Sequence, residues 1–305
     1  MLKTSVKITT CRIALRFWPK QLGRAIGLEN LASFLHNRFR LQGSISDLDE
    51  ALALARSSLQ LRPQGHPLRS ISLSTLALYL IDRFEQLETL SDLDEALSLE
   101  RNVLDLRPQG HPLRAFSLRL IATYLRLRFT HVGMSSDLDE ALALERQALE
   151  FDPREFPQQA VSLGNLADSL YDRFTEFNTL SDLDEAISLG RSALELYQEE
   201  DSGRASPLSR IAFYLHTRFM QLGTLSDLDE ALVLQRTLLE LRPRGHPDRA
   251  NSLSESLLIT SMTVSRNSEA YLTWRRPLLL NAMRWNCALR DILIEQFHWA
   301  ISPVT

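Results

Sequence analysis

Apolar residues recur along the chain in a helical pattern that returns every 45 residues. Within each repeat, apolar side chains stand at offsets of 3, 4, 7 and 11 from the first, which places them on one face of an α-helix. We call this helix A of each repeat. Its first apolar position is occupied in the five repeats by Leu28, Leu73, Leu118, Leu163 and Leu208.

A second helix, helix B, is predicted after a segment Ser-Asp-Leu-Asp-Glu-Ala. This segment occurs five times, starting at Ser46, Ser91, Ser136, Ser181 and Ser226. The serine hydroxyl is expected to cap the helix, and the acidic residues after it suit the positive end of the helix dipole. Apolar positions in helix B cover more than one stripe, which is typical of a helix packed on two sides. A Leu-Arg-Pro segment then ends helix B, because proline lacks the backbone N–H.

The fixed period predicts an all-α fold, an α-solenoid of about five helical hairpins with a C-terminal helical cap. A single hairpin buries too little apolar surface to fold alone, so each depends on its neighbours. We divide the chain into a basic segment (1–21), the repeat array (22–265) and a divergent tail (266–305). Within the array, the repeats lie near 22–66, 67–111, 112–156, 157–201 and 202–246, with a partial sixth helix at 247–265.

Two places depart from the repeat. Gln198 replaces the proline that ends helix B elsewhere, so we expect the fourth helix B to run on or fray and this junction to be the softest. The tail contains Trp274, Trp285 and Trp299, whereas the repeats contain no tryptophan. We interpret the tail as a cap on the last repeat; the alternative is a partner-binding helix or a contact for self-association.

Charge is distributed unevenly. The first 20 residues carry five basic and no acidic side chains, so the rest of the chain sums to −9 when the whole is at −4. The basic start has the character of a mitochondrial transit peptide, or else is a capping segment of a cytoplasmic protein, which we favour. An acidic body argues against nucleic acid as a partner. The chain lacks a run of 18 apolar residues, so no membrane span is predicted.

Neither a catalytic nor a metal site is predicted. His66, His111 and His246 are each a repeat or more apart, and Cys287 and His298 lack an activating motif. We therefore expect a non-enzymatic protein with no cofactor. His36 and His216 are expected to face outward from helix A. The arginines that recur in helix A, such as Arg38, are predicted to pair with acids of the Asp47 or Asp49 type.

Alanines and prolines at fixed places resemble the tetratricopeptide (TPR) repeat. In the second repeat these are Ala77, Ala96, Val103 and Pro108. The resemblance covers about residues 22–265, although ordinary TPR units have 34 residues. The RPxGHP, SLxxLA and SDLDEA segments are similar to the long TPR arrays of fungal proteins joined to a CHAT protease-like or NTPase domain, and neither domain is found here.

The resemblance implies a protein–protein interaction scaffold that binds a peptide in a concave groove lined by helices A. Positions beside the fixed ones vary between repeats, which leaves them free to specify a ligand. The expected contact residues are Leu78, Ile81, Asp82, Thr123, Arg126, Leu127, Asp168, Tyr171, Asp172, Phe213 and His216. Their mixed apolar and acidic character favours a peptide with some basic residues. The alternative is the sensor arm of a larger signalling protein whose effector domain is absent from this sequence.

Overall fold

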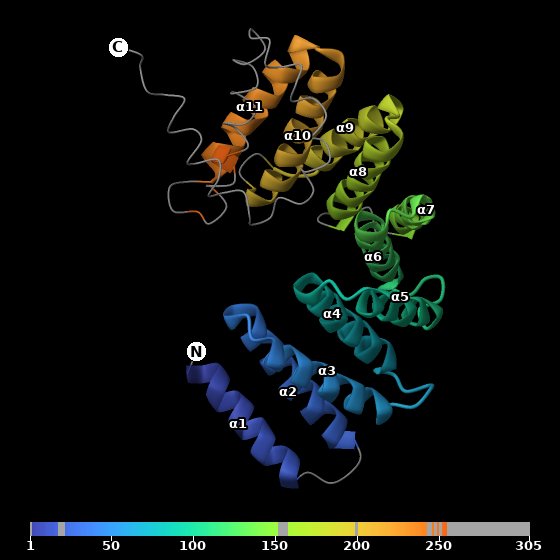
Figure 1. Ribbon diagram of the computed structural model, residues 1–305, viewed down its shortest axis with the longest axis vertical. Helices are drawn as coiled ribbons and strands as arrows, with labels where there is room; N and C mark the ends of the chain where they lie inside the picture. Colours follow the sequence, from blue (N-terminus) through green and yellow to red (C-terminus); the bar gives the residue numbers. More distant parts are fainter. Residues whose placement is uncertain are drawn as a thin grey trace. The chain divides into compact units, whose positions relative to one another are not determined.

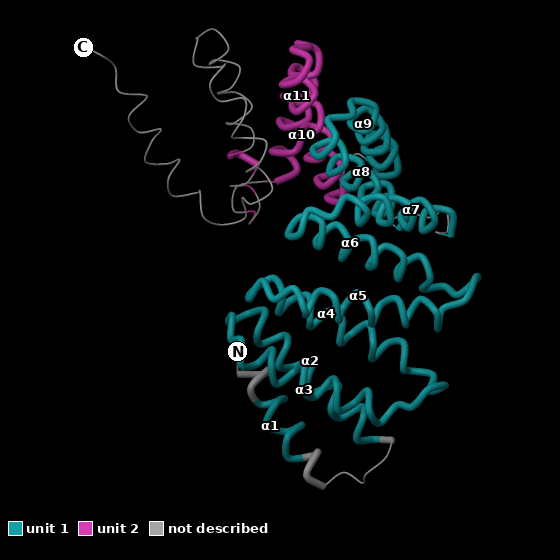
Figure 2. The backbone as a smooth tube through the Cα atoms, turned by 45° about the vertical axis from the view of Figure 1, so that its right-hand side comes forward, with its two compact units in different colours: residues 1–198 teal, residues 199–305 magenta. Residues whose placement is uncertain are grey.

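The computed structural model describes residues 2–17, 22–151, 158–198 and 201–242, together with 246, 249 and 252–254. Across these residues the chain is helical and contains no strand. It forms two compact units, unit 1 (Met1–Gln198) and unit 2 (Glu199–Thr305), which are coloured separately in Figure 2. The turn at 154–157, most of the predicted sixth helix and the tail at 266–305 lie outside the described residues.

Unit 1 consists of a leading helix followed by four helical hairpins, which succeed one another in chain order (Figure 1). The leading helix is α1 (Leu2–Phe17). The helices A are α2 (Leu22–Gln42), α4 (Arg69–Leu87), α6 (Arg114–Val132) and α8 (Gln158–Phe177). The helices B are α3 (Ile45–Gln60), α5 (Leu90–Asp105), α7 (Ser135–Phe151) and α9 (Leu180–Glu195). This arrangement confirms the predicted all-α solenoid of hairpins.

Unit 2 contains the fifth hairpin. A short 3-10 helix, η1 (Ser202–Arg204), leads into helix A, α10 (Ala205–Leu222), which is followed by helix B, α11 (Leu225–Leu241). Phe219 of α10 packs against Leu228 of α11. None of the helices in the described part of either unit is long and apolar enough to cross a bilayer.

The repeated apolar residues form a core that runs through unit 1. Leu35, Leu48, Leu80 and Leu93 are completely buried, as expected from the offsets on helices A and B. Alanines occupy the helix crossings, where a larger side chain would hold the helices apart. Each helix B of unit 1 up to α7 contacts both its own helix A and the helix A that follows. The leading helix α1 packs on α2 and adds Ile8 to the same core.

Every helix A of the described hairpins ends at a residue with a left-handed backbone. In the first four repeats these residues are Gly43, Glu88, Gly133 and Asn178, with φ between 53° and 76°. Each donates its N–H to the carbonyl oxygen of the phenylalanine four residues earlier, at 2.7 Å. This αL cap satisfies a carbonyl at the end of the helix and turns the chain directly into helix B.

The predicted serine cap of helix B is wrong. Helix α3 begins at Ile45, its N-cap residue is Ser44, and no side chain hydrogen-bonds as a cap there. Ser46 therefore lies within the first turn. Thr89, Thr179 and Thr224 occupy the N-cap position of α5, α9 and α11 in the same way. The acid of the segment, Asp47, is turned instead toward helix A, where it meets an arginine.

Helix α9 does not run on past its predicted end. It stops at Glu195, which is in register with the last residues of α3 and α5, Gln60 and Asp105. The N–H of Tyr197 donates to the Leu194 carbonyl at 3.2 Å, as the equivalent residues do after α3 and α5. The backbone turn thus forms without the proline. That this junction is the softest of the array stays a prediction, although the boundary between the two compact units falls at Gln198.

Candidate functional site

Arginines of helix A pair with the first-turn acid of helix B in all five hairpins. Arg38 Nε and Nη2 donate to the two carboxylate oxygens of Asp47 at 2.5 and 2.6 Å. The same two-bond arrangement joins Arg83–Asp92, Arg128–Asp137, Arg173–Asp182 and Arg218–Asp227. The hydrogen bond to Asp92 raises the pKa of Arg83 above its ordinary value. The predicted pairing is confirmed, and these arginines hold the hairpin together.

A second set of ion pairs joins consecutive helices B. Arg56 lies 2.8 Å from Glu95, Arg101 lies 2.7 Å from Glu140, and Arg146 lies 3.4 Å from Glu185. Their side chains are 40–50% exposed. Solvent-exposed pairs of this kind contribute little to stability, about 0–1 kcal/mol. Arg56, Arg101 and Arg146 are therefore paired within the protein, as are the arginines of helix A.

Replacing Arg128 by glutamine should lower the free energy of unfolding by about 1–3 kcal/mol. The side chain of Asp137 is only 3% exposed and would lose two charge-assisted hydrogen bonds. Chemical denaturation measures the change. The matched control is Arg146→Gln, which removes an exposed pair and should cost less than about 1 kcal/mol. Equal losses in the two variants would contradict a structural role for the Arg128 pair.

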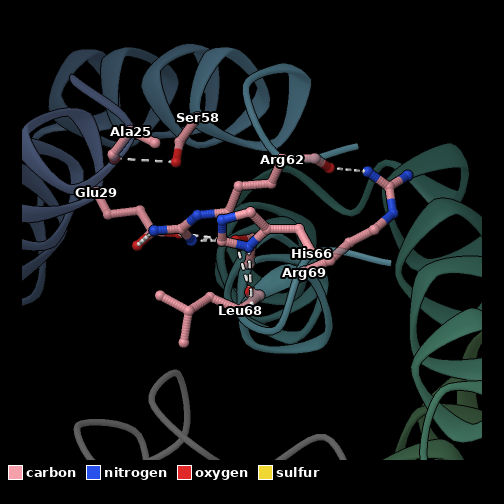
Figure 3. A network of polar contacts seen from close by, with 8 residues as sticks. Ala25, Glu29, Ser58, Arg62, His66, Leu68 and Arg69 are labelled. Carbon is pink, nitrogen blue, oxygen red and sulfur yellow. Dashed lines mark hydrogen bonds and ion pairs between the residues drawn. The ribbon is translucent and has the colours of Figure 1, made fainter. Parts of the chain in front are cut away.

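A buried polar network joins the first two hairpins of unit 1, as Figure 3 shows. Arg62, in the turn after α3, has a side chain only 2% exposed and grips the carboxylate of Glu29, with Nη2–Oε2 at 2.7 Å. It also donates to the Ser72 hydroxyl on α4, which itself donates to Glu29 at 2.8 Å. Arg69 donates to the Arg62 carbonyl. Sequence reasoning treated this arginine only as part of a helix end and missed its role.

The next hairpin repeats the network with the acid on the other helix. Arg107 donates to Ser117 at 2.6 Å and lies 3.9 Å from Glu100, which belongs to helix B instead of helix A. Ser74 and Ser117 both donate to Glu100, at 2.9 Å. Burial raises the pKa of Glu100 and lowers that of Arg107. The arginine in the turn after helix B, Arg62 or Arg107, thus links two successive hairpins through hydrogen bonds, although the carboxylate comes from helix A in one case and from helix B in the other.

The predicted contact residues on helices A divide into three rows. The first row is the most open: Leu78 is 45% exposed, Thr123 is exposed and Asp168 is half-buried. In the second row Ile81 and Tyr171 are buried while Arg126 is half-buried; in the third row Asp82 and Leu127 are half-buried and Asp172 is buried. In unit 2, Phe213 is 40% exposed and His216 is buried.

Two histidines that were expected to face outward are buried. His36 stacks on Tyr79, with ring centroids 4.4 Å apart, and forms a hydrogen bond with the carboxylate of Asp82 on the next helix A. In unit 2, His216 is also buried, and burial lowers its pKa to about 4, so it is neutral at pH 7. The outward expectation failed for His36 because the next helix A brings Tyr79 and Asp82 against it.

Sequence reasoning overlooked a row of exposed apolar residues near the start of helix A. Ile26, Ile71, Phe116 and Val161 occupy the same position in four consecutive repeats of unit 1 and are 45%, 48%, 45% and 46% exposed. They share a helix face with the first row, seven residues before it. We call them the apolar row. The sequence contains this pattern, because the same helix A position holds a large apolar residue in four repeats although it does not belong to the predicted core face.

An acidic cluster lies where α6, α7 and α8 meet. It comprises Glu145, Asp168 and Asp172, with Arg126 among them. Arg126 Nε is 2.7 Å from an oxygen of Asp172, and its Nη1 is 4.0 Å from one of Asp168. Burial raises the pKa of Asp172 against the opposing charge of Arg126. No group of His, Cys, Asp or Glu within the described ranges is arranged to hold a metal ion.

Comparison with known proteins agrees with this geometry. Residues 25–68 match the tetratricopeptide repeat family. A Podospora anserina protein assigned as a kinesin light chain, with nearly identical TPR-like repeats, has a similar structure: the TM-score is 0.51 at 18% identity, over 70% of this chain and 95% of that one. BtubC (BKLC) from P. vanneervenii has a TM-score of 0.52 at 16% identity, over 79% and 89%. None of the curated proteins matches the chain in sequence.

Stacked hairpins fastened by recurrent ion pairs define a helical-repeat protein of the α-solenoid class. The first repeat matches the tetratricopeptide repeat family, and its pattern returns along the chain with a period of 45 residues, in place of the ordinary 34. At identities below 20% the solved structures establish the fold and not a particular partner. Proteins of this class are scaffolds for protein–protein interaction.

Proposed function

We propose that the protein is an interaction scaffold that binds a peptide segment of a partner protein along the helix A face of unit 1. The observation that carries the proposal is the apolar row. The apolar row repeats at the same helix A position in four hairpins, and its large apolar side chains are about half exposed. Covering such a surface with a partner is favourable, because apolar atoms are then removed from water. The core offsets do not require them, so a role in recognition accounts for their repetition.

Residues beside the apolar row supply specificity. Ser33, Leu78, Thr123 and Asp168 hold the same position in successive repeats and differ in chemistry. On this side of helices A, the half-buried carboxylates of Asp82 and Asp168 favour a peptide that carries basic residues. An extended or helical segment that sets apolar anchors against the row and polar groups against these positions fits a known mode of peptide recognition.

Panning a random twelve-residue peptide library displayed on phage tests the proposal. The wild-type protein is expected to enrich peptides with large apolar residues. The variant with Ile71→Ser and Phe116→Ser should bind those peptides at least about tenfold more weakly, because each lost anchor contributes on the order of 1–3 kcal/mol. Fluorescence anisotropy with the enriched peptides measures the change.

Leu106→Ser provides the matched control. Leu106 is 45% exposed, as Phe116 is, but follows α5, a helix B. Its replacement should leave peptide affinity unchanged. If no peptide is enriched, or if the Leu106 variant loses as much affinity as the double variant, the helix A face is not the binding surface.

A further inference from the structure

Polar contacts join successive helices A of unit 1 beside the apolar row. At the first junction the Ser72 hydroxyl on α4 donates to the Glu29 carboxylate on α2 at 2.8 Å. Ser72 directly follows Ile71, and Glu29 lies one helical turn after Ile26. The two members of the apolar row at this junction therefore lie beside a direct contact between their helices.

The third junction of unit 1 makes the same kind of contact with other residues. Arg119 on α6 donates to the Ser162 hydroxyl on α8 at 3.0 Å. Arg119 lies one turn after Phe116, and Ser162 directly follows Val161. A direct contact between helices A therefore lies beside the apolar row at this junction as well.

At the second junction the link passes through a helix B. Ser74 on α4 and Ser117 on α6 both donate to the Glu100 carboxylate on α5, at 2.9 Å. Hydrogen bonds therefore join the helices A at the level of the apolar row at all three junctions. Packed α-helices have axes about 8–10 Å apart. We expect successive members of the apolar row to be separated by about this distance.

We propose that the apolar row binds a peptide in the polyproline II conformation that carries a large apolar residue at every third position. The inference rests on the proposed function and adds the backbone conformation of the ligand and the spacing of its apolar residues. A polyproline II chain has about three residues per turn and rises about 3.1 Å per residue. Every third side chain therefore lies on the same side, about 9 Å from the next, so one apolar side chain meets each hairpin of unit 1.

Other regular peptide conformations match the apolar row less well. In a β-strand the side chains alternate between two faces, so those on one face are about 6.6 Å apart. An α-helix buries apolar residues at offsets of three and four, which places one about every 5 Å along its axis. Both conformations would set apolar side chains between the members of the row, where polar groups such as Glu29 and Arg119 join the helices A.

The random twelve-residue library used for the proposed function also tests this inference. Peptides enriched on the wild-type protein should carry large apolar residues three positions apart. A fluorescein-labelled peptide with four leucines at every third position, separated by proline and serine, is then compared with a peptide of the same composition whose leucines stand at every second position. A third peptide has one extra serine after the second leucine. The first peptide should bind at least about tenfold more tightly than either of the others.

The protein variants connect the spacing to the apolar row. Replacing both Ile71 and Phe116 by serine should remove the preference for leucine at every third position, whereas Leu106→Ser should keep it. Tighter binding of a copy in which alanine replaces the prolines would contradict the polyproline II conformation, because alanine favours an α-helix. Enrichment of apolar peptides with another spacing, or equal affinity for the peptide with the extra serine, would overturn the inference and leave the proposed function intact. Absence of any enriched peptide would overturn both.

Discussion

Replacing Arg62 by methionine should lower the free energy of unfolding by about 3–5 kcal/mol, as expected when one partner of a buried ion pair is removed. The side chain of Arg62 is 2% exposed and is the main partner of the Glu29 carboxylate and of the Ser72 hydroxyl. Methionine fills similar space but leaves the carboxylate of Glu29, whose side chain is 25% exposed, without its charged partner. Chemical denaturation followed by circular dichroism measures the loss.

Two companion variants test the cause. Arg56→Met removes an arginine of α3 whose side chain is 43% exposed, and it should cost less than about 1 kcal/mol. Adding Glu29→Gln to Arg62→Met should recover part of the loss, because the uncompensated charge disappears. If Arg62→Met lowers the free energy of unfolding by no more than Arg56→Met does, the buried network does not stabilise the contact between the two hairpins.

Stability should fall as the pH rises, and Glu145 should account for much of the fall. The pKa of this carboxyl is about 8 in the folded protein and 4.5 when exposed. Between these values the folded state holds a proton that the unfolded chain has released, so folding takes up a proton. The contribution is fully present below pH 4.5 and is lost by about pH 8, with a slope of up to about 1.4 kcal/mol per pH unit.

Glu145→Gln isolates this effect. The amide has no proton to lose, so the variant should be more stable than the wild type at pH 8 by several kcal/mol and should show a flatter pH profile. Glu150→Gln, at an exposed position of α7, should follow the wild-type profile. Unfolding free energies measured at intervals from pH 4.5 to pH 8.5 provide the comparison. Parallel profiles for the wild type and Glu145→Gln would contradict the expected titration.

The fold could be predicted from the sequence because its main determinant is a strict period. Offsets such as those of Leu73, Leu76 and Leu80 fix a helix face without knowledge of any partner. The pairing of Arg38 with Asp47 was also predictable, since the two are nine residues apart, on either side of the turn between helix A and helix B, and recur together in each repeat. These interactions are local in the chain, so the repeat itself reveals them.

The missed features depend on contacts between hairpins. Arg62 finds Glu29 33 residues away, and the equivalent carboxylate in the next repeat, Glu100, comes from a different helix, so no fixed spacing marks the network. His36 was predicted to face solvent because the pattern of one helix does not reveal which neighbouring helix covers that face. The next helix A brings Asp82 against it. Whether the first row and the apolar row bind a ligand depends on a partner and stays a prediction.

The junctions between successive helices A differ in their chemistry. The first pairs His36 with Asp82 and the third pairs Arg126 with Asp172, whereas the matching positions at the second are the apolar Ile81 and Leu127. Exchanging the second and third repeats would set Leu127 beside His36 and Ile81 beside Asp172, which leaves both polar groups unmatched. Near-identical repeats can pair out of register, and the unlike contacts at the junctions of unit 1 disfavour this particular exchange.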